Sequence, residues 1–251
     1  MQGLNGKVFW ISGGAGGIGT ATGKRLLEAG ARVFLADRSD EVFETAKTLG
    51  DGARAGLVDV TDADAVKKSV QEAVDAFGRL DGLHLNAGTE GNVAPLAEFG
   101  AADFQKVLDV NVLGVLYGLQ AGFPHLKDNG GSVVITSSVA GLQGTPGMAA
   151  YGTSKHAVIG LMRTAAIEWG EAGIRVNTVN PGPIDNRMMD SIEKMASPGE
   201  EDTLRSQYEG QIPLNRYGRS EEIASMVAFL LSSEASYANG NIFVVDGGMR
   251  A

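Results

Sequence analysis

The chain has 251 residues, of which 43% are hydrophobic and 20% charged, so it is long enough to bury a large core. A formal net charge of -9 argues against a general nucleic-acid or anionic-membrane surface, because such surfaces bind through Lys and Arg. With no cysteine and three widely separated histidines, the sequence excludes a disulfide framework and a thiol nucleophile, and we expect no metal site.

The sequence also shows no targeting or membrane segment. The apolar run VFWIS at 8–12 is too short for the hydrophobic part of a signal peptide, and glycines follow it instead of a cleavage site. No continuous apolar run approaches the ~20 residues that span a bilayer. We therefore expect a cytoplasmic protein that partners neither nucleic acid nor a membrane.

Short apolar runs alternate with longer amphipathic stretches along the chain. The apolar runs predict strands at 7–12, 31–36, 55–58, 82–86, 132–137, 174–179 and 242–245, and the stretches between them predict helices at 17–29, 40–49, 62–77, 101–126, 150–169 and 220–232. Most of these strands are continuously apolar, which is typical of parallel strands covered on both faces. We predict one α/β domain over 1–251, a doubly wound (Rossmann) parallel sheet of about seven strands whose ligands bind at the strands' carboxyl ends.

A glycine-rich loop follows the first predicted strand. In SGGAGGIGTATG, Gly13, Gly17 and Gly19 form a G-x-x-x-G-x-G pattern between a buried strand and an amphipathic helix. Glycines at such a turn allow positive φ and leave room for a pyrophosphate at the helix N-terminus. A plain turn is the alternative, whereas a P-loop is disfavoured because no G-K-[ST] follows.

The second strand ends at Asp37, 18 residues after Gly19. A carboxylate here can accept both hydroxyls of an adenosine ribose and would repel a 2′-phosphate, so Asp37 favours NAD over NADP. Arg38 leaves NADP use open, because an Arg at this point can pair with a 2′-phosphate. Capping of the next helix is the other role open to Asp37, although Ser39 or Asp40 would serve equally well.

The next two strand ends add further candidates for the cofactor site. Asp59 is placed to accept a hydrogen bond from an adenine amino group, with Val60 beside the ring, and capping of the helix at 62–77 is the alternative role of Asp59. In LNAG at 85–88, Asn86 can tie neighbouring strands together, and Gly88 lets the backbone approach the cofactor.

A candidate reacting pair lies at the start of the helix at 150–169. Tyr151 and Lys155 are four residues apart and share one helix face, and the strand ending in ITSS delivers Ser137 and Ser138 to the same sheet edge. A neighbouring ammonium favours the phenolate, so we expect Lys155 to lower the pKa of Tyr151 and make it a general acid/base. The strand pattern does not choose between the two serines.

The glycine loop, Asp37, NAG, SS and YGTSK occur in an order that resembles the short-chain dehydrogenase/reductase family along nearly the whole chain. DVNVLGV with Asn111, NPGPID at 180–185 and DGG at 246–248 extend the likeness. Ser12, Leu85 and Asn186 depart from the family pattern, which has threonine, asparagine and threonine there.

The resemblance implies hydride transfer between nicotinamide and a secondary alcohol or ketone carbon. It implies that Tyr151 moves the proton, that Ser138 polarises the substrate oxygen, and that Lys155 holds the nicotinamide ribose and tunes Tyr151. It also implies that Asn111 supports a water that links Lys155 to solvent. Further cofactor contacts are implied at Ile18, Ala87, Pro181, Gly182, Ile184 and Asn186.

The stretch 186–217 breaks the alternation of strands and helices, and it corresponds to the family's substrate-covering lid. Its methionines offer flexible apolar contact. Candidate substrate contacts are Glu90, Gln143, Met148, Met188 and Met189. The resemblance also implies a homotetramer built partly on the helices at 101–126 and 150–169.

Three functions remain open from the sequence. The first is an NAD-dependent alcohol dehydrogenase or ketone reductase. The second is a 3-oxoacyl carrier-protein reductase, which would prefer NADPH and need a basic patch. The third is a non-catalytic nucleotide sensor, which would be expected to lose Tyr151, Lys155 or Ser138.

Overall fold

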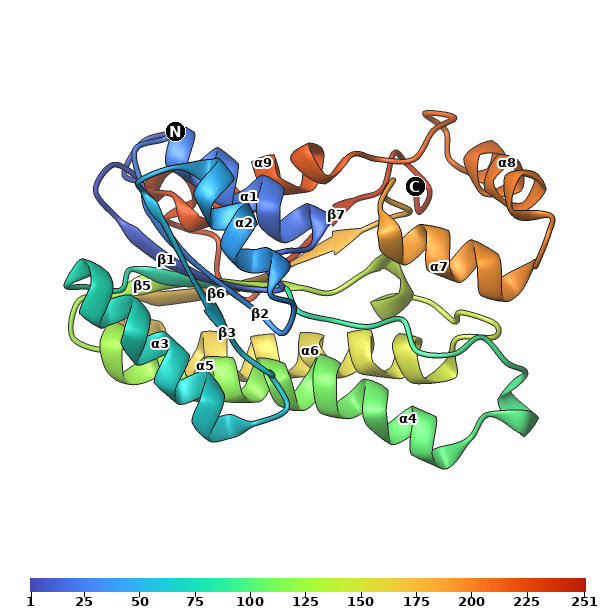
Figure 1. Ribbon diagram of the computed structural model, residues 1–251, viewed down its shortest axis with the longest axis horizontal. Coiled ribbons are helices and arrows are strands. Elements are labelled where there is room, and N and C mark those ends of the chain that lie inside the picture. The colour runs from blue at the N-terminus through green and yellow to red at the C-terminus, as the bar shows by residue number, and fades with distance from the viewer.

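The computed structural model describes residues 1–251 and contains one seven-stranded, wholly parallel sheet (Figure 1). The strand order is β3-β2-β1-β4-β5-β6-β7, so the order reverses between β1 and β4. The strands are β1 Val8–Ser12, β2 Arg32–Asp37, β3 Ala53–Leu57, β4 Gly82–Leu85, β5 Gly131–Thr136, β6 Ile174–Pro181 and β7 Ile242–Val245. The predicted doubly wound fold is confirmed, and each of the seven predicted strands is present within a few residues of its expected place.

Helices cover both faces of the sheet. One face carries α1 Gly17–Glu28, α2 Glu41–Leu49 and α9 Ser220–Leu231, and the other carries α3 Ala63–Phe77, α4 Ala101–Leu108, α5 Gly114–Leu126 and α6 Ala149–Glu168 (Figure 1). Each face has its own apolar core, because the continuously apolar strands point side chains to both sides. Gly30 and Gly78 adopt positive φ just after α1 and α3, as expected for helix ends.

The predicted helix at 101–126 is not a continuous α-helix. A π-helical turn, η2 Asp109–Leu113, separates α4 from α5 and contains the buried Asn111. A wider turn redirects the side chains within it, and hydrophobic periodicity does not reveal it. By length and composition alone the stretch Ala101–Leu126 could span a membrane. Here it packs against α3, α6 and β4 as one layer of the fold.

Residues 186–217 are largely helical, which the sequence analysis did not predict. They form α7 Arg187–Ala196 and α8 Glu201–Gln211, which lie beyond the carboxyl ends of the strands (Figure 1). No residue of α8 is buried, so its sequence carries no apolar stripe that would indicate a helix. Five 3₁₀ or π turns complete the structure, the 3₁₀ turns being η1 Leu96–Glu98, η3 Val139–Gly141, η4 Gly170–Ala172 and η5 Ser233–Ala235.

Candidate active site

The glycine loop forms an amide-lined cradle at the N-terminus of α1. Gly13 has φ of +67°, and a Cβ on Gly19 would collide with the carbonyl oxygen of Gly13, so both positions require glycine. The backbone amides of Gly17, Ile18 and Gly19 donate to no protein acceptor, because the first loop-to-helix bond is made by the amide of Thr20. Free amides at a helix N-terminus fit the pyrophosphate of a dinucleotide.

Asp37 lies beside this cradle at the end of β2. Its Oδ2 accepts from the amide of Ala15 at 3.0 Å and its Oδ1 accepts from the amide of Ser39 at 3.0 Å. These bonds orient the carboxylate, and each oxygen keeps lone-pair capacity for a ribose hydroxyl. Asp37 does not cap α2, because that helix begins after Asp40 without a side-chain cap. Arg38 is exposed beside Asp59, where its charge helps to lower the pKa of the Asp59 carboxyl.

The cap of α3 is Asp62, whose Oδ1 accepts from the amides of Asp64 and Ala65. Asp59 therefore does not cap that helix, which leaves its adenine role as the open prediction. Hydrogen bonds from the amide and hydroxyl of Thr61 to Oδ1 are the main cause that lowers the pKa of Asp59. The neighbouring Val60 is half-buried and packs against Gly114 of α5.

The junction between β1, β4 and β5 is held by side chains. Asn86 donates from Nδ2 to the carbonyl of Gly13 at 3.3 Å and accepts at Oδ1 from Thr136 at 3.1 Å. The hydroxyl of Ser12 accepts from the amides of Asn86 and Ala87 at 3.0 and 3.1 Å. The tying role predicted for Asn86 is confirmed, and the hydroxyl of Ser12 joins β1 to the same segment.

Tyr151 and Lys155 lie together at the start of α6. The Lys155 side chain is 4% exposed, its Nζ donates to the carbonyl of Thr136 at 2.9 Å, and it lies 5.5 Å from the centroid of the Tyr151 ring. A Cβ added to Gly88 would lie 3.5 Å from this Nζ, so Gly88 leaves the approach to Lys155 open. Loss of water around the ammonium lowers the pKa of Lys155 to about 8.

The expectation that Lys155 lowers the pKa of Tyr151 is wrong for the chain without ligand. Burial raises the pKa of Tyr151 to about 12, and the nearby Glu90 carboxylate raises it further, whereas a hydrogen bond with Ser138 opposes the shift. Desolvation of the phenol is the largest cause, and the Lys155 ammonium donates to the carbonyl of Thr136 rather than to the phenol. The phenol is therefore protonated at neutral pH.

Of the two serines, Ser138 faces Tyr151. Ser138 is 9% exposed, and its Oγ accepts from the amide of Ala140 at 3.1 Å. The hydroxyl of Ser137 points away and donates to the carbonyl of Lys155 at 2.9 Å, which ties β5 to α6. Asn180, which the sequence analysis did not single out, donates from Nδ2 to the carbonyl of Ser138 at 2.8 Å.

Asn111 connects three segments of the site. Its Oδ1 accepts from the amide of Thr89 at 2.8 Å, and its Nδ2 donates to the carbonyl of Thr89 and to Ser154 Oγ, both at 2.9 Å. Ser154 in turn donates to the carbonyl of Tyr151 at 2.7 Å. Thr89 and Ser154 were missed from the sequence, because a small polar residue in a loop or helix carries no pattern of its own.

The segment after β6 runs along the same sheet edge. Ile184 is 5% exposed and bridges to Gly218, and Gly182 packs so closely against Asp246 that a Cβ would lie 2.9 Å from it. Asn186 caps α7 by accepting from the amides of Met188 and Met189 at 3.0 and 3.3 Å. Its Oδ1 is thereby engaged, so only its Nδ2 remains to donate to a cofactor. Pro181, the last residue of β6, is buried.

The candidate substrate contacts lie in different environments. Met188 and Met189 are half-buried in the first turn of α7, whereas Met148 is 7% exposed and precedes α6. Gln143 is exposed, and its Oε1 accepts from Arg250 at 2.6 Å. Glu90 is half-buried near Tyr151.

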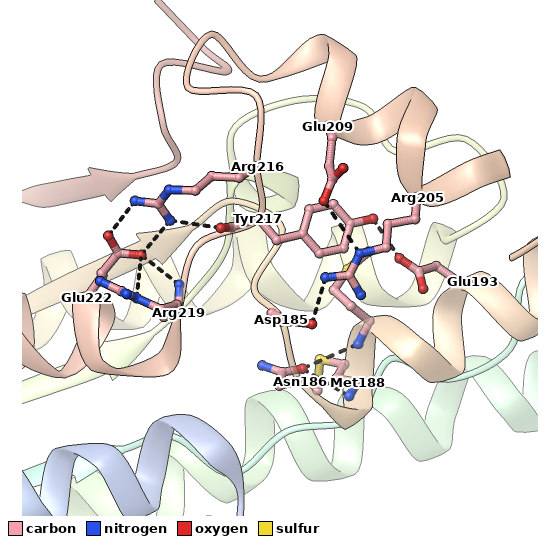
Figure 2. Close-up of polar contacts among 11 residues, drawn as sticks. Asp185, Asn186, Met188, Glu193, Arg205, Glu209, Arg216, Tyr217, Arg219 and Glu222 are labelled. Atoms are coloured by element: carbon pink, nitrogen blue, oxygen red, sulfur yellow. Dashed lines mark hydrogen bonds and ion pairs between the residues drawn. The ribbon is translucent and has the colours of Figure 1, made fainter. Parts of the chain in front are cut away.

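A polar cluster fastens α7 and α8 to the segment that carries Ile184 (Figure 2). Arg205 of α8 pairs with Asp185 at 2.8 Å and lies 4.6 Å from the centroid of the Tyr217 ring. Tyr217 is 3% exposed and donates to the buried Glu193 of α7 at 2.6 Å. Burial and the adjacent carboxylate raise the pKa of Tyr217. These contacts join both helices to the strand end, and no part of the cluster was predicted.

Comparisons with known proteins agree with this geometry. A family model described as Enoyl-(Acyl carrier protein) reductase matches residues 13–250. Levodione reductase from Leifsonia aquatica is 38% identical over 98% of this chain and 94% of that protein. The 3-oxoacyl-[acyl-carrier-protein] reductase from Thermotoga maritima is also 38% identical, over 98% of both chains.

Solved structures of oxidoreductases are similar to this chain as well. The crystal structure of levodione reductase matches with a TM-score of 0.93 and 38% identity over 97% of each chain. The crystal structure of an NAD⁺-bound xylitol dehydrogenase matches with a TM-score of 0.92 and 37% identity, over 98% of this chain and 99% of that one. The chain therefore belongs to the short-chain dehydrogenase/reductase family of oxidoreductases.

Proposed function

We propose that this protein is an NAD-dependent oxidoreductase that transfers a hydride between nicotinamide and a secondary alcohol or ketone carbon, with Tyr151 as the general acid/base. One observation carries the proposal. The phenol of Tyr151, the hydroxyl of Ser138 and the buried ammonium of Lys155 converge at the sheet edge where the glycine-loop cradle also lies.

Tyr151, Ser138 and Lys155 have separate roles in the proposed reaction. A bound nicotinamide cofactor would supply or accept the hydride. In the direction of ketone reduction, Tyr151 Oη donates its proton to the substrate oxygen, which suits a phenol that burial keeps protonated. Ser138 Oγ hydrogen-bonds the same oxygen and polarises the carbonyl. Lys155 Nζ would hold the nicotinamide ribose, and alcohol oxidation would run these proton movements in reverse.

The remaining predicted contacts would hold the cofactor. The free amides of Gly17, Ile18 and Gly19 would bind the pyrophosphate, Asp37 the adenosine ribose, and Asp59 and Val60 the adenine. Backbone at Ala87 and Gly88 would border that ribose. Pro181, Gly182, Ile184 and the amide of Asn186 would lie on the nicotinamide side.

The NAD preference is supported by the carboxylate of Asp37, which a 2′-phosphate would have to approach. The NAD⁺-bound xylitol dehydrogenase is a structural relative that carries this cofactor. We also propose weaker use of NADP. The guanidinium of Arg38 is exposed at the same edge and can pair with a 2′-phosphate.

A 3-oxoacyl carrier-protein reductase is the second candidate, favoured by the relative from Thermotoga maritima and by the matching family model. An acidic carrier needs a basic docking surface, and the net charge of -9 disfavours it. A non-catalytic nucleotide sensor is less consistent, because Tyr151, Ser138 and Lys155 are all present.

Titration with NADH and NADPH, followed by assays of secondary alcohols and ketones, tests the proposal. We expect tighter binding of NADH and turnover of at least one alcohol with NAD. Turnover only of acyl carrier-protein thioesters with NADPH would favour the second candidate. Tight NADH binding without any turnover would favour the sensor.

We further propose a cytoplasmic homotetramer in which α4, α5 and α6 contribute to the subunit interfaces. Sedimentation velocity of the purified protein tests the assembly, since a tetramer of 26.1 kDa chains separates clearly from a monomer or a dimer. A monomer at micromolar concentration would contradict it.

A further inference from the structure

Glu90 is an unpaired carboxylate close to the reacting tyrosine. It is the second residue of the loop that continues from Gly88, it is half-buried, and its side chain makes no hydrogen bond or ion pair within the chain. Its charge nevertheless reaches Tyr151, where it raises the pKa of the phenol. A carboxylate that is partly removed from water and has no protein partner is placed to accept a hydrogen bond from a ligand.

The backbone on both sides of Glu90 is fixed. The amide and the carbonyl of Thr89 are both bonded to the side chain of Asn111, which is 1% exposed. Gly91 has φ of +71°, and a Cβ there would collide with Val107 of α4. Glu90 therefore projects from a loop that is pinned before it and after it.

The same contacts relate Glu90 to Tyr151. Asn111 donates to Ser154 Oγ, and Ser154 donates to the carbonyl of Tyr151. Two buried side chains thus connect the backbone at Thr89 to the backbone at Tyr151. The segments that carry the carboxylate and the phenol are therefore joined by one buried hydrogen-bonded framework, which fixes them relative to each other as a specificity contact requires.

We propose that Glu90 is a specificity-determining residue that accepts a hydrogen bond from a second hydroxyl of the substrate, so that the preferred substrates are diols or hydroxyketones. The inference rests on the proposed alcohol chemistry and deepens it. An alcohol without a second donor would leave the carboxylate desolvated and unpaired, which the site disfavours. A neutral hydroxyl suits the site better than an ammonium, because Lys155 already places a buried cation there.

The test compares Glu90→Gln with the wild type, using cyclohexanol and the isomeric 1,2-, 1,3- and 1,4-cyclohexanediols with NAD. The amide keeps the size of the side chain and removes its charge. We expect the ratio of kcat/KM for the best diol to that for cyclohexanol to fall about tenfold or more, mainly through KM. In alcohol oxidation the phenolate of Tyr151 is the base, so the acidic limb of the pH profile is expected to move to lower pH, because a charge that raises the pKa of Tyr151 is gone.

Glu98→Gln is the matched control, because Glu98 is an exposed carboxylate eight residues further along the same connection and forms no ion pair. It is expected to leave the ratio within about twofold, as surface charge changes usually do. An unchanged ratio in Glu90→Gln would overturn the inference. Preferred turnover of an amino alcohol such as 2-aminocyclohexanol by the wild type would overturn it as well.

Binding measurements separate this inference from the proposed function. Saturation-transfer NMR of the diol and of cyclohexanol on the NADH-loaded protein reads the contact without turnover. If the wild type oxidises neither compound but binds the diol about tenfold more tightly than Glu90→Gln does, the proposed function fails and the Glu90 contact stands. Equal binding of the diol by both proteins would refute the contact.

Discussion

The buried histidine of β4 allows a quantitative test of the core beneath the site. His84 is 0% exposed, and its Nε2 lies 2.9 Å from Thr136 Oγ1. Because that hydroxyl donates to Asn86, the histidine must donate from Nε2, and its Nδ1 has no hydrogen-bond partner. Burial lowers the pKa of His84 to about 3, so the folded protein keeps the ring neutral.

The sign of the pH effect follows from the two pKa values. As pH falls below about 6.5, the unfolded chain binds a proton at this histidine and the folded chain does not, so the free energy of unfolding falls. The stabilisation is complete above pH 6.5 and declines by about 1.4 kcal/mol per pH unit down to the folded pKa. Between pH 8 and pH 5 this one residue should account for a loss of about 2 kcal/mol.

Urea unfolding of the wild type and of His84→Gln at pH 8 and pH 5 measures this loss, at one fixed protein concentration. Fluorescence of Trp10, which is 1% exposed, reports unfolding. The variant keeps a donor for Thr136 and has no proton to bind. We expect the free energy of unfolding of the wild type to drop by about 2 kcal/mol more than that of the variant. Equal drops would refute the reasoning, because they would mean that folding leaves the pKa of His84 unchanged.

Two further perturbations examine the cofactor edge and the lid. Asp37→Ala is expected to reduce the ratio of kcat/KM for NAD to that for NADP about tenfold or more, because the ribose acceptor and the charge opposing a 2′-phosphate both disappear. An unchanged ratio would show that Asp37 only orders the glycine loop. Arg205→Ala removes the contacts of α8 with Asp185 and Tyr217, and proteolysis between α7 and α8 should accelerate about two- to fivefold with little change in Tm. Exposed Arg163→Ala is its control, and equal cleavage rates in the two variants would show that the cluster does not hold the lid helices.

The fold was predictable because its elements carry strong patterns. Runs such as VFWIS and SVVIT are buried on both faces of the sheet, and each gave a strand close to its observed bounds. Asp37 ends a strand, and Gly17 and Ser138 follow strand ends, so their meeting at one edge followed from parallel topology alone. The glycine loop was equally clear, because its glycines lie close together in the sequence, although only Gly19 is required by a local contact, with Gly13, whereas a Cβ on Gly17 would meet Ser220.

Features that depend on tertiary surroundings were missed or mistaken. The π turn at Asn111 keeps the apolar pattern of an ordinary helix, so the sequence does not indicate it. Its role, to direct the Asn111 side chain to Thr89 and Ser154, is visible only in the contacts of that side chain. The pKa of Tyr151 was expected to fall, because a sequence shows the neighbouring cation but not the loss of water around the phenol. α8 was not predicted, since a helix without a buried residue has no apolar face.

The most direct test of the central claim is the turnover of Tyr151→Phe with NAD and the best alcohol found for the wild type. The substitution removes only the hydroxyl that moves the proton, so we expect kcat to fall by about 100-fold or more while the Kd for NADH stays within about threefold. Fluorescence of bound NADH gives the Kd, and absorbance of NADH gives the rate. Retained turnover in Tyr151→Phe, with NADH bound normally, would contradict the account.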